Sequence, residues 1–210
     1  MKHIGIIGAG ISGLATAKAF IEKGYRVTVF EKAANVGGVW ERSRSYVGVA
    51  TQTTRDEYAF SDYPMPGGYP LWPSGEQVQA YLEGYAKQFN VFQNIWFNVQ
   101  VNTLCYRDKA WHMELTDLKT KEGKYLRFDF VAVCTGTFHK PFIPSVEGSE
   151  SFMQAGGEIL HSSQAKDAGM LKDKKVAVVG FAKSATDIAT TAANFSKECI
   201  LLYRKAQWKV

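Results

Sequence analysis

Cysteine is scarce in this chain of 210 residues, and its three copies, Cys105, Cys134 and Cys199, lie far apart. No C-x-x-C pair is present, so the sequence predicts neither a zinc ribbon nor a redox-active dithiol. Unpaired cysteines of this kind favour a reducing compartment, and we expect a cytoplasmic location. No metal-ligand spacing is found, and the sequence predicts no metal site.

Long apolar runs and a stripe of one charge are also missing. No stretch approaches the length of a membrane-spanning helix. The apolar residues after Met1-Lys2-His3 are interrupted by glycines, which argues against a signal peptide. The net charge of +5 is modest and Lys and Arg form no continuous stripe, so we expect no nucleic-acid partner. The composition, 46% hydrophobic and 21% charged, is that of an ordinary globular protein.

What the chain does contain is one strand–turn–helix–strand cassette in two copies. The first has the turn Gly8-Ala9-Gly10-Ile11-Ser12-Gly13 and ends at Glu31. The second has the turn Gly180-Phe181-Ala182-Lys183-Ser184-Ala185 and ends at Arg204-Lys205. In both copies the turn follows an apolar strand run and opens a helical stretch. This order is typical of dinucleotide-binding Rossmann units.

The first copy has every glycine that the pattern requires. Gly8 permits a tight turn, Gly10 lets the backbone approach a pyrophosphate, and Gly13 allows close helix–strand packing. The free N–H groups at the start of the following helix suit phosphates. An acid at the end of the second strand accepts hydrogen bonds from ribose hydroxyls. The predicted cofactor-binding residues here are Gly8, Gly10, Ser12, Gly13, Glu31 and Lys32.

The second copy departs from the pattern, since Ala182 replaces the middle glycine and Ala185 the third. A methyl group at 182 is expected to hold a pyrophosphate slightly farther from the backbone. An arginine after the second strand favours a ribose 2′-phosphate. The alternative is an ordinary βαβ unit without a ligand. The predicted cofactor-binding residues are Gly180, Ala182, Lys183, Ser184, Ala185, Arg204 and Lys205.

Between the cassettes, the pattern predicts a helix from Ser74 or Gly75 to about Phe89. Three strands are expected near 95–104, 110–116 and 125–133, with turns at 107–109 and 120–123. The last strand leads through Thr135-Gly136 to Pro141 and Pro144, which read as a stiff hinge. We therefore predict an α/β protein with two Rossmann-like domains, 1–144 with an antiparallel excursion and 145–210, the second apparently incomplete.

These motifs together resemble the N-terminal part of the flavin-containing monooxygenase family, in its plant-like or microbial branch. The resemblance covers all 210 residues in order. It implies FAD at the first cassette and NADPH at the second. The motifs that carry it are G-A-G-I-S-G at 8–13, Glu31, Gly37-Gly38-Val39-Trp40, Phe60-Ser61-Asp62-Tyr63-Pro64, Cys134-Thr135-Gly136, the G-x-x-x-H at 157–161, and Tyr203-Arg204-Lys205 followed by Trp208.

The resemblance adds Gly38, Val39, Trp40, Thr135 and Gly136 to the cofactor-binding residues. It also makes Gln52 the candidate catalytic residue, an amide beside the flavin or the nicotinamide. The alternatives are that Trp40 is a core residue and that Gln52 is a polar loop residue.

Three departures from the family pattern concern the substrate class more than cofactor binding. In the family's F-x-G-x-x-x-H-x-x-x-(Y/F) stretch, Phe152 is displaced from Gly157 and Ala165 takes the final aromatic place. Gln52 stands where many members carry asparagine, and Ala182 departs in the second turn. Family members are also longer, so we expect a fragment, a split-gene product or one part of a two-piece enzyme.

The resemblance implies that NADPH reduces FAD and that a flavin hydroperoxide then oxidises nitrogen or sulfur in a small molecule. The expected partners are therefore a nucleophilic substrate and O2, with a separate C-terminal half or a second copy left open. Two alternatives remain at this point. One is an NADPH oxidase or flavin reductase without oxygenation, and the other is a truncated, non-catalytic FAD/NADP-binding module.

Overall fold

The computed structural model describes residues 1–138 and 140–206, and Trp208 lies outside them. The chain divides into two compact units. The first comprises Met1–Ser43 and Thr51–His139, and the second comprises Arg44–Ala50 and Lys140–Val210. The sequence places the division near residue 144 and assigns no separate role to 44–50. Which cofactor each unit binds stays a prediction.

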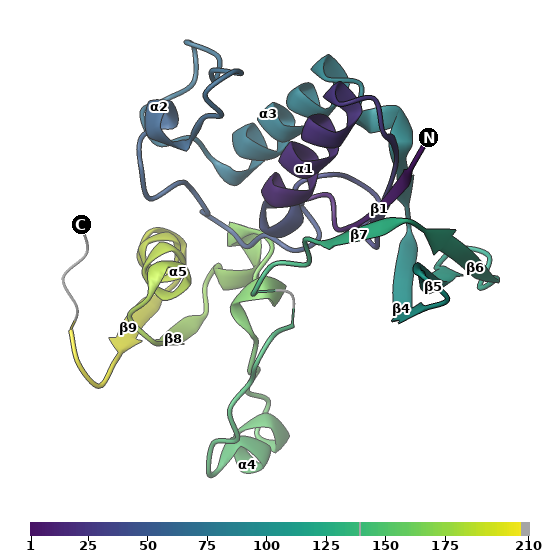
Figure 1. Cartoon of the computed structure of the whole chain (residues 1–210). Coiled ribbons are helices and arrows are strands. Elements are labelled where there is room, and N and C mark those ends of the chain that lie inside the picture. The colour runs from purple at the N-terminus through teal and green to yellow at the C-terminus, as the bar shows by residue number, and fades with distance from the viewer. Residues whose placement is uncertain (139, 207–210) are drawn as a thin grey trace. The chain divides into compact units, whose positions relative to one another are not determined.

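A parallel sheet forms the centre of the first unit, with strand order β3-β2-β1-β7. Its strands are β1 (His3–Ile7), β2 (Arg26–Glu31), β3 (Ile95–Phe97) and β7 (Phe130–Val133). From Val27 to Glu31 every residue of β2 is buried, as in a strand covered on both faces. Helix α1 (Ile11–Glu22) packs on this sheet, and α3 (Gly75–Gln88) lies beside α1 (Figure 1). The predicted α/β architecture is confirmed here.

Helix α3 begins as the sequence predicts. Ser74 is the N-cap, its hydroxyl accepts the Gln77 N–H at 3.3 Å, and the Gln77 side chain accepts the Ser74 N–H at 2.9 Å. The stripe Val78, Tyr81, Leu82 and Tyr85 is buried. The expected apolar face therefore packs into the core.

The Phe60–Pro64 motif is fastened to these two helices. The Tyr81 hydroxyl accepts the Phe60 N–H at 2.7 Å and donates to the Tyr63 carbonyl at 2.5 Å. Lys18 of α1 forms an ion pair with Asp62. A short helix, α2 (Arg55–Tyr58), precedes the motif. The loop between α2 and α3 is thus held in one place by hydrogen bonds and charge.

An antiparallel sheet with order β4-β5-β6 forms the excursion that the sequence predicts. Its strands are β4 (Val99–Arg107), β5 (Ala110–Asp117) and β6 (Gly123–Phe128). Asp108 and Lys109 both have positive φ, 51° and 57°, as a two-residue hairpin turn requires. Met113, Leu115 and Phe128 form a buried cluster with Phe30 of β2.

Two predicted strands are wrong as single elements. The stretch 95–104 breaks at Asn98, where φ is 57° and the N–H bonds to the Ala33 carbonyl, so β3 and β4 join different sheets. The stretch 125–133 breaks at Asp129, whose N–H bonds to the His3 carbonyl at 3.0 Å. Strand-forming residues stand on both sides of each break, so composition gives no sign that the chain changes sheets.

The second unit contains a two-stranded parallel sheet of β8 (Lys175–Val179) and β9 (Glu198–Leu202), with α5 (Lys183–Phe195) on one face. Val178, Ile188 and Ala165 form its small core. On the strands, Val179 is 80% exposed and Leu202 49% exposed. This unit also contains α4 (Ser149–Gln154), η3 (Ser162–Gln164) and η4 (Ala168–Leu171), and the first unit has η1 (Gly38–Trp40) and η2 (Phe92–Asn94).

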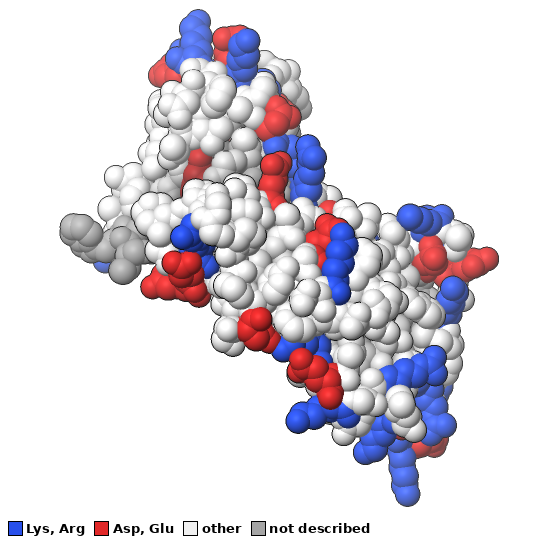
Figure 2. Space-filling model, turned by 90° about the horizontal axis from the view of Figure 1, so that it is seen from above, with Lys and Arg blue, Asp and Glu red and all other residues white. Residues whose placement is uncertain are grey.

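Within the described residues, no helix is both long and apolar enough to cross a membrane. On the face shown in Figure 2, acidic and basic side chains are interspersed and broad uncharged areas separate them.

Gly13→Ala tests the contact that sets α1 on the sheet. A Cβ at Gly13 would lie 1.9 Å from the Gly8 carbonyl oxygen, which is backbone and cannot rotate away. We expect the free energy of unfolding to fall by about 3 kcal/mol in urea denaturation followed by circular dichroism. The control is Gly67→Ala, whose Cβ would have no heavy atom within 4 Å. Similar losses in both variants would contradict this account.

Candidate functional site

The first glycine turn lies at the carboxyl edge of the parallel sheet. Gly8 has a φ of 104°, and its N–H donates to the Phe30 carbonyl at 2.8 Å. The Cys134 N–H donates to the Ile7 carbonyl at 2.8 Å, and a Cβ on Gly8 would lie 2.5 Å from the Cys134 oxygen. The turn, the end of β2 and the start of the Thr135-Gly136 segment are therefore brought together.

Gly10 has a reason to be glycine beyond the one that the sequence suggests. Its φ of −82° and ψ of −172° suit any residue, so conformation does not require glycine. Space does: a Cβ here would lie 3.4 Å from the Gly38 Cα, and one on Gly38 would lie 3.0 Å from the Gly10 Cα. The two glycine turns approach each other backbone to backbone, so both predicted cofactor residues lie at one place.

Glu31 closes the turn with charge-assisted hydrogen bonds. Its carboxylate accepts the Ala9 N–H through Oε2 and the Ala33 N–H through Oε1, each at 2.8 Å. The residue is only 4% exposed. Each carboxylate oxygen keeps acceptor capacity after one bond, so hydrogen bonds from ribose hydroxyls are compatible with this arrangement. Lys32, the next residue, is exposed.

Helix α1 begins at Ile11, and its N-cap Gly10 has no side chain to cap it. The Leu14 N–H bonds to the Gly10 carbonyl at 3.0 Å. The N–H groups of 11–13 have no carbonyl one turn earlier, and no acidic residue stands in the first turn. Ser12, in this turn, is exposed. The end of α1 therefore fits an anionic phosphate group.

The structure places Trp40 in the core. It is 9% exposed, and its Nε1–H donates to the Tyr58 hydroxyl at 2.9 Å with the rings edge to face. Burial raises the pKa of Tyr58, and the hydrogen bond from Trp40 opposes that rise. Val39 is 47% exposed, and Thr135 and Gly136 are exposed. A flavin contact by these residues stays a prediction.

Gln52 and its neighbour Thr51 differ sharply in burial. Gln52 is exposed, and no described contact joins it to the glycine turn. Thr51 is 3% exposed and donates its N–H to the Pro73 carbonyl at 3.0 Å. Among the described residues its hydroxyl is the buried side-chain group with no hydrogen-bond partner. Such a group is costly unless a ligand or a bound water satisfies it. The sequence gives no sign of it, because threonine recurs through this T-Q-T-T run.

The second cassette repeats the backbone of the first with a constant offset of 172 residues. Gly8 corresponds to Gly180, whose φ is 128° and whose N–H donates to the Leu202 carbonyl at 2.8 Å. Helix α5 begins at Lys183 as α1 begins at Ile11. Ala182 has a φ of −80° and a ψ of 178°, nearly those of Gly10. The methyl group at 182 therefore meets no conformational penalty.

The structure matches the end of β2 to the end of β9 differently from the sequence interpretation, which places Arg204 at the position of Glu31. Ile7 pairs with Phe30 and Val179 pairs with Leu202, so the counterpart of Glu31 is Tyr203. Arg204 stands one residue farther, opposite Lys32 in this comparison. The Tyr203 and Phe181 rings lie 4.4 Å apart, where the first cassette has the hydrogen bond between Glu31 and Ala9.

Arg204 and Lys205 are exposed, and neither forms an ion pair with any residue that the structure describes. They follow the end of β9 at Leu202. Among the described residues, the carboxyl edge of this sheet thus carries two cations without an ion-pair partner and no acid at the place of Glu31.

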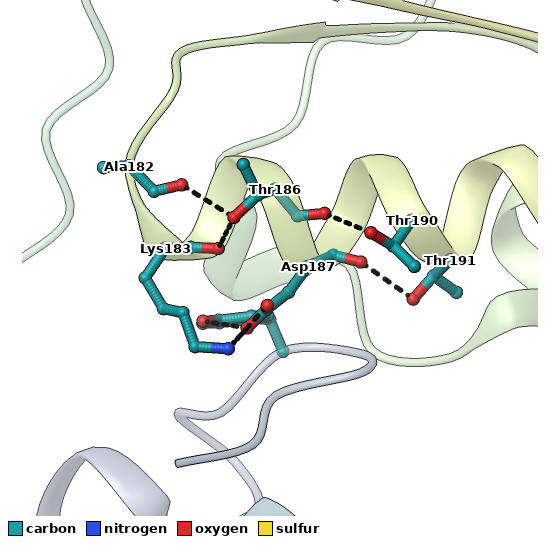
Figure 3. A network of polar contacts seen from close by, with 7 residues as sticks. Ala182, Lys183, Thr186, Asp187, Thr190 and Thr191 are labelled. Carbon is teal, nitrogen blue, oxygen red and sulfur yellow. Dashed lines mark hydrogen bonds and ion pairs between the residues drawn. The ribbon is translucent and has the colours of Figure 1, made fainter. Parts of the chain in front are cut away.

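Lys183 and Ser184 are engaged with groups of the chain. The Lys183 ammonium lies 2.6 and 2.7 Å from the two Asp187 carboxylate oxygens (Figure 3). The Tyr46 hydroxyl donates to Asp187 Oδ2 at 3.0 Å and shares a hydrogen bond with the Ser184 side chain. Burial is the main cause that raises the pKa of Tyr46 to about 12. The described residues contain no group of three potential metal ligands.

Comparison with known proteins identifies the family. The flavin-binding monooxygenase-like family matches residues 1–210. The chain belongs to this family. Flavin-containing monooxygenase 1 of Rattus norvegicus is 34% identical over 223 aligned residues, which cover all of this chain and 41% of that protein. This flavin-binding monooxygenase-like chain therefore spans about two fifths of the length of this curated relative.

Comparison with solved structures supports the same family assignment. The S-allyl-L-cysteine S-oxygenase from Allium sativum has a TM-score of 0.82 and 26% identity, over 99% of this chain and 52% of that one. The structure of OTEMO in complex with FAD and NADP has a TM-score of 0.80 and 24% identity, over 99% of this chain and 39% of that one, and shows the fold. The predicted family and fold class are confirmed for this flavin-binding monooxygenase-like chain.

Proposed function

We propose that this chain is the FAD- and NADPH-binding N-terminal part of a flavin monooxygenase that oxidises nitrogen or sulfur in a small molecule. The observation that carries the proposal is the complete glycine turn, with Glu31 and the open end of α1 at the same sheet edge, in a chain of this family. The carboxyl edge of a parallel sheet is where open α/β folds bind nucleotides.

Bound FAD would supply the oxygen chemistry: with two electrons from NADPH, one atom of O2 would pass to the substrate and the other would leave as water. The chain's own groups hold and orient the cofactor. The N–H groups at the start of α1 would hold the pyrophosphate, and Glu31 would accept hydrogen bonds from the ribose. Gly10 and Gly38 place no side chain at the point where the two glycine turns meet. Thr135 and Gly136 would line the same edge.

Thr51 and Gln52 are assigned to the flavin itself. The unpartnered Thr51 hydroxyl is a hydrogen-bonding group already removed from water, so binding it to the cofactor costs little further desolvation. Gln52 follows it directly and would supply an amide near the flavin or the nicotinamide. Val39 and Trp40 belong to the turn that meets Gly10, which supports a role for them beside the cofactor.

The second cassette is assigned to NADPH. The end of α5, with Gly180, Ala182, Ser184 and Ala185, would receive the pyrophosphate. Tyr203 replaces the acid, so no carboxylate at this place repels a 2′-phosphate, and Arg204 and Lys205 supply positive charge. Sulfur as a target is supported by the similarity to an S-oxygenase.

The decisive activity test uses the purified 210-residue chain supplied with FAD. We expect NADPH consumption that rises with an added thioether or tertiary amine, together with an oxide product quantified by mass spectrometry. Oxidation of NADPH with stoichiometric peroxide release and no oxide would instead indicate an oxidase or flavin reductase. Flavin absorbance bands without any NADPH oxidation would indicate a binding module.

Thr51→Val separates cofactor binding from folding. The change removes the buried hydroxyl and keeps the shape, so we expect FAD affinity to fall about fivefold to tenfold while the FAD-free chain unfolds at the same or higher urea concentration. FAD binding is followed by quenching of flavin fluorescence. Thr53→Val is the control, because Thr53 is exposed. Unchanged FAD affinity in Thr51→Val would remove Thr51 from the site.

Arg204→Ala tests the 2′-phosphate assignment. Loss of a charge-assisted contact is expected to weaken NADPH about tenfold or more and NADH less than about twofold, measured by nucleotide fluorescence under anaerobic conditions. Lys172→Ala, which removes an exposed lysine of the same unit, should change neither affinity. Equal losses for NADPH and NADH would refute the role.

A further inference from the structure

Lys183 is a predicted phosphate-binding cation that already has a charged partner among the described residues. Its ammonium contacts both oxygens of Asp187, one turn along α5, at 2.6 and 2.7 Å. Figure 3 shows the lysine side chain running along the helix toward this carboxylate. The Lys183 and Asp187 side chains are 29% and 13% exposed, so the pair is partly shielded from water. A phosphate at this helix end must therefore compete with Asp187 for the lysine.

Asp187 has a second donor in Tyr46. Within the described part of the chain, the Asp187 carboxylate is held by Lys183 Nζ and by the Tyr46 hydroxyl, which donates to Oδ2 at 3.0 Å. A tyrosine hydroxyl is protonated at neutral pH, and burial raises the pKa of Tyr46 further, to about 12, so this hydroxyl remains a donor.

The segment that carries Tyr46 is fixed within the second unit. The Val47 N–H donates to the Ala165 carbonyl at 2.8 Å, and Lys166 Nζ donates to the Ser45 carbonyl at 2.8 Å. At Gly48, with a φ of 75°, a Cβ would lie 2.5 Å from the Thr191 hydroxyl oxygen of α5. None of these contacts of the Tyr46 segment involves Lys183.

We propose that Asp187 competes with the phosphates of NADP for Lys183, and that Tyr46 is the positioning residue that holds Asp187 when the lysine moves to the phosphate. The proposal rests on the NADPH site proposed above. Without Tyr46, departure of Lys183 would leave a carboxylate that is 13% exposed with no partner, and a buried unpaired charge is strongly disfavoured. The phenol thus lowers the cost of releasing the lysine.

The two partners of the carboxylate have opposite effects on affinity. Removing the charge of Asp187 frees Lys183 and takes a negative group away from the phosphates, so it strengthens binding. Removing the Tyr46 hydroxyl makes release of Lys183 harder, so it weakens binding. If the ion pair had a purely structural role, loss of the Asp187 charge and loss of the Tyr46 hydroxyl would both weaken NADP+ binding or would both leave it unchanged.

The experiment measures NADP+ binding to the purified chain by isothermal titration calorimetry at low ionic strength, where charge effects are least screened. We expect Asp187→Asn to bind NADP+ about threefold to tenfold more tightly and Tyr46→Phe about fivefold more weakly. Lys183→Met should weaken binding, and Asp187→Asn should give no gain in the Lys183→Met background. This double variant shows whether the gain passes through the lysine.

Glu198→Gln is the matched control. It changes the net charge of the same unit by the same amount and breaks an exposed ion pair with Lys175 of 3.1 Å. We expect its NADP+ affinity to stay within about twofold of wild type. Thermal unfolding identifies the variants that are folded. If Asp187→Asn does not fold, Tyr46→Phe decides the question, because it keeps the ring and loses one oxygen.

Three outcomes would overturn this inference alone, provided that the wild type binds NADP+. Folded Asp187→Asn would show no gain in NADP+ affinity, or a gain no larger than that of Glu198→Gln. Alternatively, folded Tyr46→Phe would bind NADP+ with unchanged affinity. Absence of NADP+ binding in wild type and in every variant overturns the proposed NADPH site and this inference with it.

Discussion

The backbone contact between Gly13 and the Gly8 carbonyl oxygen is the constraint on which the first site depends. No side chain fits there, because a single Cβ would lie 1.9 Å from that oxygen. The contact lets α1 start close to the end of β1, so its first N–H groups lie near the turn to which Glu31, at the end of β2, is hydrogen-bonded. If the helix stood farther away, the glycine turn, the acid and the helix end would no longer form one site.

The two cassettes have the same backbone arrangement but carry different side chains where the second strand meets the turn. In the first, a carboxylate and a backbone N–H join the strand end to the turn. In the second, two aromatic rings do so, and the cations follow outside. Ala185 stands at the place of Gly13, and a Cβ placed on Gly180 would lie 3.3 Å from its methyl group. The difference lies in side chains and not in strand pairing.

Local features were the ones that sequence could predict. The glycine turns, the cap at Ser74 and the buried face of α3 follow from neighbours within one or two helical turns, so their spacing carries the information. The sheet changes at Asn98 and Asp129 depend on partners elsewhere in the chain, Ala33 and His3, and no local pattern shows them.

The candidate site was predictable to the same degree. Its glycines and Glu31 follow from the motif, whereas the engagement of Lys183 could not be read from the cassette alone. The helix period places Asp187 next to Lys183, but the Tyr46 donor lies 141 residues before Asp187 in the chain. Thr51 was missed because lack of a partner is a property of packing. Counting from the turn matches Arg204 to Glu31, but the strand pairing shows that Tyr203 is the counterpart of Glu31.

Because of the constant offset of 172 residues, the two cassettes of this chain can be compared with each other residue by residue. Each residue of one cassette has a counterpart on the same backbone framework in the other, as an original and a copy do after an internal duplication. A difference in nucleotide preference between the two halves can therefore be traced to particular pairs, such as Glu31 with Tyr203 and Gly10 with Ala182. When such residues are exchanged between the two cassettes, the nucleotide preference of one cassette can be measured against that of the other in the same polypeptide.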